Sequence, residues 1–101
     1  MNIQRWSESD PPEASKLRKQ LEDEGYVVTE HSDAPGAVYE AHTHDTDQTT
    51  WILTGEVEFN SAGETYRLRE GDRDFLPANT EHSAIVVGSE TVRYLTGVKN
   101  S

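Results

Sequence analysis

The sequence predicts a single all-β domain, an antiparallel sandwich or barrel, preceded by one short helix. The chain has 101 residues, which is the length of one domain. From residue 26 onward, short runs of β-branched and aromatic residues follow one another, separated by Gly, Pro, Asn and Asp. Several of these runs alternate between apolar and polar residues, as strands do when one face covers a core.

Residues 1–25 are expected to form an arm and an amphipathic helix that pack on the barrel formed by residues 26–101. Asp10 can cap a helix that begins at Pro11, with Glu13 at the third helical position, where a capping box places a carboxylate. An apolar stripe then follows at helical spacing, formed by Ala14, Leu17 and Leu21, and Gly25 is a natural C-terminal stop.

Eight strands are expected in the barrel: 26–32, 37–44, 48–54, 56–60, 64–69, 73–76, 82–87 and 91–98. The segments 54–56 and 61–64 contain glycine and are expected to be hairpin turns. Within 56–60, Val57 and Phe59 alternate with polar residues, which indicates one buried face and one solvated face. Arg67 and Arg69 are expected on such a solvated face, and Trp51 in the core.

Composition and charge exclude several classes of function. Nine basic and nineteen acidic residues give a net charge of -10, which disfavours nucleic acid and anionic membranes as partners. The absence of cysteine excludes disulfides, thiolate zinc sites and cysteine nucleophiles. No apolar run is long enough to span a membrane, and the N-terminus lacks the pattern of a signal peptide, so we expect a cytoplasmic protein.

Three of the four histidines carry the chemical signal. His42 and His44 are two residues apart on an expected strand, so both imidazoles leave the same face as a pair of metal ligands. Gln48 follows at the head of the next strand, and His82 comes after a turn much later in the chain. His31 is expected to be an ordinary surface or interface histidine.

The spacing around these histidines resembles the two motifs of the cupin superfamily. The first is Gly, five residues, His-x-His, three or four residues, Glu, six residues, Gly, and here it is carried by Gly36, His42, His44, Gln48 and Gly55. The second is Gly, five residues, Pro-x-Gly, two residues, His, three residues, Asn, and its positions hold Gly71, Pro77, Asn79, His82 and Val86. Seven of the ten fixed positions match.

The resemblance implies a small antiparallel jelly-roll barrel, or double-stranded β-helix. It also implies one divalent transition metal inside the barrel, held by His42, His44, His82 and Gln48. Three imidazoles suit Fe, Mn, Ni, Cu, Co or Zn. Gln48 replaces the usual Glu and removes one negative charge, so metal affinity should fall and metal-bound water should be more acidic. Metal binding is preferred because all three histidines are present; the alternative is a site that no longer holds metal.

Strand parity predicts the walls of the pocket around this site. Val38 and Glu40 share the face of His42, Thr50 and Ile52 that of Gln48, and Ala84 and Val86 that of His82. Glu40 would be a general base or a hydrogen-bond partner of a histidine, unless a bulge or an edge position turns it to water. Tyr94 is a further candidate for the pocket or the core. The predicted cavity is largely apolar and suits a small-molecule ligand.

The favoured hypothesis is a metal-dependent enzyme on a small molecule, with oxygenase chemistry first and isomerase or lyase chemistry second. The alternatives are a non-catalytic module that binds or senses a ligand or metal, and a metal-free barrel that serves only in assembly. By resemblance to small cupins, a homodimer is expected, and exposed strand edges give a physical reason for pairing.

Overall fold

The computed structural model describes residues 2–99, which form one helix and nine strands. The elements are β1 (Asn2–Gln4), α1 (Ala14–Asp23), β2 (Tyr26–Asp33), β3 (Val38–His42), β4 (Gln48–Thr54), β5 (Glu56–Ser61), β6 (Glu64–Leu68), β7 (Arg73–Phe75), β8 (His82–Val87) and β9 (Val92–Lys99). Within these residues, no helix is long and apolar enough to cross a membrane.

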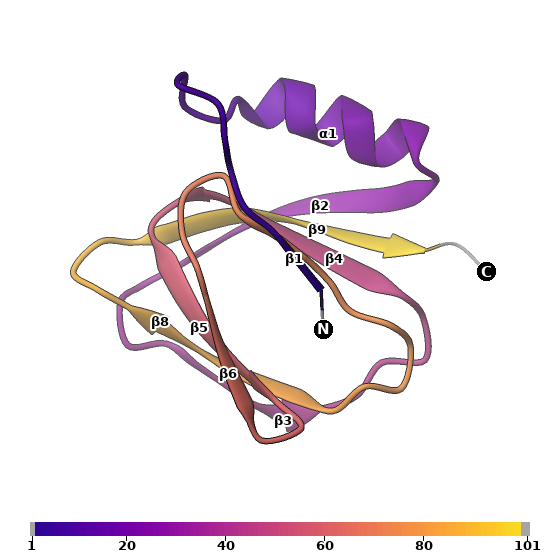
Figure 1. The fold of residues 1–101 in the computed structure, drawn as a ribbon, viewed down its shortest axis with the longest axis vertical. Helices are drawn as coiled ribbons and strands as arrows, with labels where there is room; N and C mark the ends of the chain where they lie inside the picture. Colours follow the sequence, from indigo (N-terminus) through magenta and orange to yellow (C-terminus); the bar gives the residue numbers. More distant parts are fainter. Residues whose placement is uncertain (1, 100–101) are drawn as a thin grey trace.

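The strands form two antiparallel sheets that face each other. One has the order β1-β7-β4-β9-β2 and the other β3-β8-β5-β6, so most neighbours in space are distant in sequence. Figure 1 shows the two sheets enclosing the interior, with α1 lying across β2 and β9 on the outer side. This arrangement confirms the predicted all-β jelly-roll class with one short helix.

All eight predicted strands are present, and their ends differ from the expectation by two residues or fewer. The additional strand is β1, which lies in the segment expected to be an arm. It pairs antiparallel with β7, with Ile3 opposite Asp74. Three residues are too few to show alternation, so the sequence carried no signal for this edge strand.

The helix starts later than predicted, at Ala14. Glu13 occupies the N-cap position with extended backbone and no side-chain cap, so the predicted cap by Asp10 is wrong. Two consecutive prolines explain the difference, because a residue before proline is disfavoured in the helical region and Pro12 therefore keeps Pro11 extended. The carbonyl of Asp10 instead accepts a hydrogen bond from the Trp6 indole at 3.0 Å.

Only one of the two predicted hairpin turns is a hairpin. Ala62 and Gly63 both have positive φ and join the paired strands β5 and β6, as a type I′ turn does. Gly55 instead joins β4 of one sheet to β5 of the other. Its φ is +84°, and a Cβ there would lie 2.8 Å from the Cα of Val92, so glycine is required by both conformation and space.

Two apolar clusters stabilise the molecule. The first fills the space between the sheets and consists of Ile52, Val57, Phe59, Leu68, Ala84, Val86 and Val92. The second lies between α1 and the outer face of the larger sheet and consists of Leu17, Leu21, Trp51, Leu53 and Leu95. The predicted apolar stripe of the helix and the core position of Trp51 are confirmed.

Arg73 is a charged residue buried under the helix, with 2% of its surface exposed. Its guanidinium forms an ion pair with Glu24 at 2.7 Å and a hydrogen bond to the Thr49 hydroxyl at 2.8 Å. It also stacks over the rings of Trp51 and Phe75, at 4.8 and 4.3 Å from the centroids. These partners replace the water that the charge loses, so Arg73 links the end of α1 to β7.

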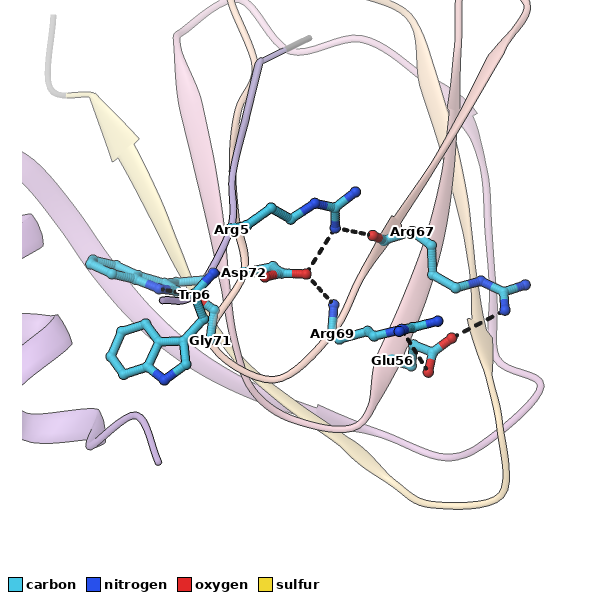
Figure 2. Close-up of polar contacts among 8 residues, drawn as sticks. Arg5, Trp6, Glu56, Arg67, Arg69, Gly71 and Asp72 are labelled. Atoms are coloured by element: carbon cyan, nitrogen blue, oxygen red, sulfur yellow. Dashed lines mark hydrogen bonds and ion pairs between the residues drawn. The ribbon is translucent and has the colours of Figure 1, made fainter. Parts of the chain in front are cut away.

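The segment between β1 and α1 is fastened to the turn before β7, as Figure 2 shows. The Asp72 carboxylate accepts hydrogen bonds from the Arg5 guanidinium and from the backbone amides of Trp6 and Arg69. Burial alone would raise the pKa of Asp72, but these three donors outweigh it and hold the pKa below its ordinary value. The indole of Trp6 is thereby placed against Gly71.

Replacing Gly71 by alanine should displace Trp6 and destabilise the protein. Gly71 has a φ of +87°, and its added Cβ would lie 2.2 Å from the Trp6 side chain. Positive φ costs alanine about 1 to 2 kcal/mol, and overpacking adds about 1 to 3 kcal/mol. Urea unfolding measures the change in free energy. Gly63→Ala is the control, because φ there is +78° with nothing within 4 Å of the added Cβ. Equal losses in the two variants would contradict the contact with Trp6.

Candidate metal centre

Three histidines from two segments of the sequence meet at one end of the space between the sheets. His42 ends β3, His82 begins β8, and the two are register partners across the sheet. His44 follows β3 by two residues. One possible ligand atom from each residue lies within 4.8 Å of the others. The ring centroids of His42 and His82 are 4.3 Å apart, and His44 lies 4.6 and 5.3 Å from them.

The expected strand 37–44 ends at His42, so His44 lies in the loop after β3. The turn before β8 holds it in position. The backbone amide of Asn79 donates to the His44 carbonyl at 2.7 Å. Asn79 has a φ of +62°, which suits the one motif position where this chain has Asn in place of Gly. The Asp47 carboxylate accepts from the amide of Ala78 at 2.8 Å. The two motifs thus hold each other in place.

Two of the three imidazoles are oriented by backbone carbonyls. The Nδ1 atom of His42 lies 2.5 Å from the Glu40 carbonyl oxygen, and that of His82 lies 3.1 Å from the Thr80 carbonyl oxygen. A carbonyl can only accept, so Nδ1 carries the proton in each ring and Nε2 keeps a free lone pair. This is the arrangement in which protein histidines bind metal.

The surroundings also favour neutral imidazoles. Burial lowers the pKa of His82. The hydrogen bond to the Thr80 carbonyl opposes this shift, and the neighbouring His42 and His44 add to it. Burial lowers the pKa of His44 as well, and His42 adds to it. Both rings therefore lose their protons more readily than a free histidine, and metal ions meet less competition from protons.

The histidines line a cavity of about 230 Å³, which has room for a small molecule. Gln48 lines the same cavity, as do three of the expected wall residues, Thr50, Ala84 and Tyr94. The remaining lining residues are Tyr39, Val57, Phe59 and Thr96. Ile52 and Val86, also expected as wall residues, do not line the cavity; they belong to the core between the sheets, with 0% and 2% of their surface exposed.

A β-bulge in β3 moves Val38 and Glu40 out of the site. Tyr39 pairs with Ala84 and His42 pairs with His82, so three steps along β3 match two steps along β8. The extra residue reverses the parity, and Tyr39 rather than Glu40 enters the cavity with His42. Val38 is 61% exposed and the Glu40 side chain is exposed, which corrects their expected inward orientation. Glu40 contacts the site through its backbone carbonyl.

The sequence did not predict four of the lining residues, which are Tyr39, Val57, Phe59 and Thr96. The alternation within 56–60 puts Val57 and Phe59 on a buried face, but nothing in the sequence places them beside the histidines. Thr96 lies opposite Thr50 on the neighbouring strand, and that register was not readable from the sequence.

His31, expected at the surface, is exposed on β2 and stacks on Tyr94.

The donor set fits a transition metal. Nitrogen ligands of a tetrahedral ion about 2.0–2.1 Å away are roughly 3.4 Å from each other. The observed upper limit of 4.8 Å between ligand atoms exceeds this separation by an amount that small side-chain rotations can close. Gln48 adds a neutral amide to the same cavity. The set has no charge, whereas the usual motif would supply a carboxylate at position 48.

Comparison with known proteins agrees with this geometry. The family model for the cupin domain matches residues 29–98. The chain therefore belongs to the cupin family. No curated protein matches the sequence.

Solved structures show the same fold. A conserved protein of unknown function from Streptococcus pyogenes is 28% identical, with a TM-score of 0.65 over 76% of this chain and 67% of that one. A Klebsiella pneumoniae protein with a double-stranded β-helix domain is 26% identical, with a TM-score of 0.65 over 74% and 67% of the two chains. A predicted oxalate decarboxylase from Thermotoga maritima is 21% identical, with a TM-score of 0.68 over 82% and 74%, a likeness of fold alone.

A buried carboxyl group lies on β7 of the larger sheet, beside Thr50 of β4. Asp74 is 1% exposed, and its Oδ1 accepts a hydrogen bond from the Thr50 amide at 2.7 Å. Burial raises the pKa of Asp74 to about 7, although the Thr50 amide and the charge of Arg73 oppose the shift. A folded-state pKa above the ordinary 3.8 means that the folded protein binds this proton more tightly than the unfolded chain.

The contribution of Asp74 to stability is therefore greatest below pH 3.8, falls as the pH rises to about 7, and is constant above that. Asp74→Asn keeps the acceptor for Thr50 and removes the charge, so it should stabilise the protein at pH 8 by about 1 to 4 kcal/mol. The gain should shrink at pH 5. Urea unfolding at both pH values measures it, with the exposed Asp45→Asn as control. A gain that does not depend on pH would contradict the burial argument.

His82→Ala should abolish metal binding while leaving the fold intact. The variant removes one of three clustered imidazoles, whereas His31→Ala removes the fourth histidine outside the cluster. Plasma mass spectrometry of untagged protein, before and after reloading with Fe, Mn, Co, Ni, Cu or Zn, measures the metal content. We expect about one ion per chain in the wild type and in His31→Ala, and none in His82→Ala. Equal loss of metal in both variants would contradict the site.

Proposed function

We propose that this cupin is a metal-dependent enzyme acting on a small molecule. The observation that carries the proposal is the cluster of His42, His44 and His82 at one end of a cavity. Two of these rings present Nε2 because backbone carbonyls hold their Nδ1 protons. Catalytic metal sites require metal-binding side chains at one end of a cavity that also has room for a small molecule.

His42, His44 and His82 would hold one divalent transition metal, with the Gln48 amide oxygen as a weak fourth ligand. When bound, such a metal supplies Lewis-acid chemistry at a substrate oxygen or redox chemistry toward dioxygen. The Glu40 and Thr80 carbonyls fix the orientation of two ligand rings. Val57, Phe59 and Ala84 line the cavity with apolar surface, which limits water around the substrate.

Oxygenase chemistry is the first class, because a neutral three-histidine set resembles cupins that activate dioxygen or a substrate oxygen. Isomerase or lyase chemistry is the second class. The outward orientation of Glu40 supports this order, because it removes the expected acid–base side chain from the cavity. The likeness in fold to a predicted oxalate decarboxylase is a reason to test isomerase or lyase chemistry as well.

The same neutral walls favour a second candidate, a cupin that binds or senses a ligand without transforming it. Among residues 2–99, the side chains that line the cavity include no carboxylate and no lysine or arginine. A metal-free barrel used only in assembly is the third outcome.

We further propose a cytoplasmic homodimer that pairs through the exposed edge strand β2, where Val27 is 56% exposed. Light scattering that gives the mass of one chain would contradict the dimer.

Turnover separates these candidates. Protein loaded with each metal is incubated with hydroxy acids, keto acids and catechols, and oxygen consumption and products are measured. An enzyme should give product in the wild type and in His31→Ala, and none in His82→Ala. Saturable ligand binding with no product would establish the binding module. Neither metal nor ligand binding would leave only the assembly role.

Gln48→Glu should tighten the binding of divalent metal by at least tenfold. The substitution restores a negative charge beside three neutral imidazoles, and one extra charge–charge attraction of about 1.4 kcal/mol is sufficient for that factor. Isothermal titration with zinc measures the affinity. Thr50→Val, which changes another lining residue without adding charge, is the control. Unchanged affinity in Gln48→Glu would place residue 48 outside the ligand shell.

A further inference from the structure

A second polar cluster lies at the cavity and is not part of the histidine site. The hydroxyl oxygens of Tyr39 and Tyr94 are 3.1 Å apart, and the two residues come from opposite sheets, on β3 and β9. Both hydroxyls donate to the same Oδ2 atom of Asp33, with a distance of 3.0 Å from Tyr94. We refer to Asp33, Tyr39 and Tyr94 as the tyrosine–aspartate cluster.

The tyrosine–aspartate cluster and the histidines lie at different levels of one cavity. Tyr39 and Tyr94 line it, whereas Asp33 is connected to it through their hydroxyls. Tyr39 precedes His42 by three residues on β3, and Tyr94 pairs with Ile52, four residues beyond Gln48 on β4. At about 3.3 Å per strand residue, the two polar ends are separated by roughly 7 to 13 Å. This length corresponds to a short extended molecule.

The directions of these hydrogen bonds define which ligand group the tyrosine–aspartate cluster can recognise. A carboxylate only accepts hydrogen bonds, so both phenol protons point toward Asp33. The phenol oxygens then offer lone pairs to the cavity, backed by the negative charge of Asp33. Burial and the bond to Asp33 raise the pKa of Tyr39, and burial raises that of Tyr94, so both phenols keep their protons.

We propose that the tyrosine–aspartate cluster binds the ammonium group of a substrate whose other end presents an oxygen to the histidine site. This inference rests on the proposed function and names the substrate class of that site, a short molecule with a primary amine and a carboxylate or similar oxygen donor. Two acceptor oxygens and one negative charge complement an ammonium group, which has three donors and a positive charge. Tyr39 and Tyr94 touch the substrate, and Asp33 is a positioning residue.

The alternative role of the cluster is mechanical, because it also ties strands of the two sheets together. The two roles differ in what the phenol hydroxyl does. A mechanical tie affects every ligand of the cavity equally, through stability. Recognition of an amine affects only ligands that carry the amine.

The first experiment compares 4-aminobutyrate with butyrate on zinc-loaded protein by isothermal titration. We expect 4-aminobutyrate to bind at least tenfold more tightly to the wild type. In Tyr94→Phe and Asp33→Asn this preference should fall to near onefold, with butyrate and zinc affinities unchanged. Tyr66→Phe is the matched control, because its hydroxyl bonds Glu64 in an exposed position and Tyr66 does not line the cavity. No preference in the wild type, or an equal loss for both acids, would overturn the proposal.

A second experiment separates this inference from the metal site. Butylamine has no oxygen donor and requires only the tyrosine end, so it can be tested on metal-free protein. We expect it to shift the NMR ring signals of Tyr39 and Tyr94 in the wild type and not in Asp33→Asn. Such shifts would support the amine site even if zinc failed to bind, in which case the proposed enzyme alone would fail. The absence of shifts in the wild type would overturn the inference.

Discussion

The β-bulge in β3 is the constraint on which the site depends. One extra residue between Tyr39 and His42 lets side chains three positions apart enter the same cavity. In a regular strand, Tyr39 would face solvent and Glu40 would place a carboxylate beside the histidines. The bulge therefore exchanges a buried charge for a phenol, and gives the cavity a neutral wall with hydrogen-bonding groups at two levels.

The two sheets can leave a cavity between them because contacts on the outer face of the larger sheet also stabilise the fold. The larger sheet is covered on its outer face by α1, where Leu21 and Leu95 are fully buried and Arg73 joins the helix to β7. The N-terminal segment is held at the edge by Asp72. These contacts contribute stability on the far side of the sheet, so the inner face can leave space for a ligand instead of being packed throughout.

The sequence predicted what depends on local spacing and missed what depends on register. Alternation and turn residues located the eight strands, and the histidine spacing identified the three residues that meet at one point. Parity failed for Val38 and Glu40, because a bulge leaves no mark in a single sequence. Asp33 and Tyr94 are 61 positions apart and meet only through sheet pairing, so no local pattern connects them.

The proposed function requires that His42, His44 and His82 bind one metal ion together. X-ray absorption spectroscopy at the metal edge of the loaded protein tests it most directly, because imidazole ligands give a characteristic multiple-scattering signal. We expect three imidazole nitrogens at about 2.0–2.1 Å for zinc, together with oxygen ligands and no sulfur. A first shell of oxygen atoms with fewer than three imidazoles would contradict the three-histidine centre.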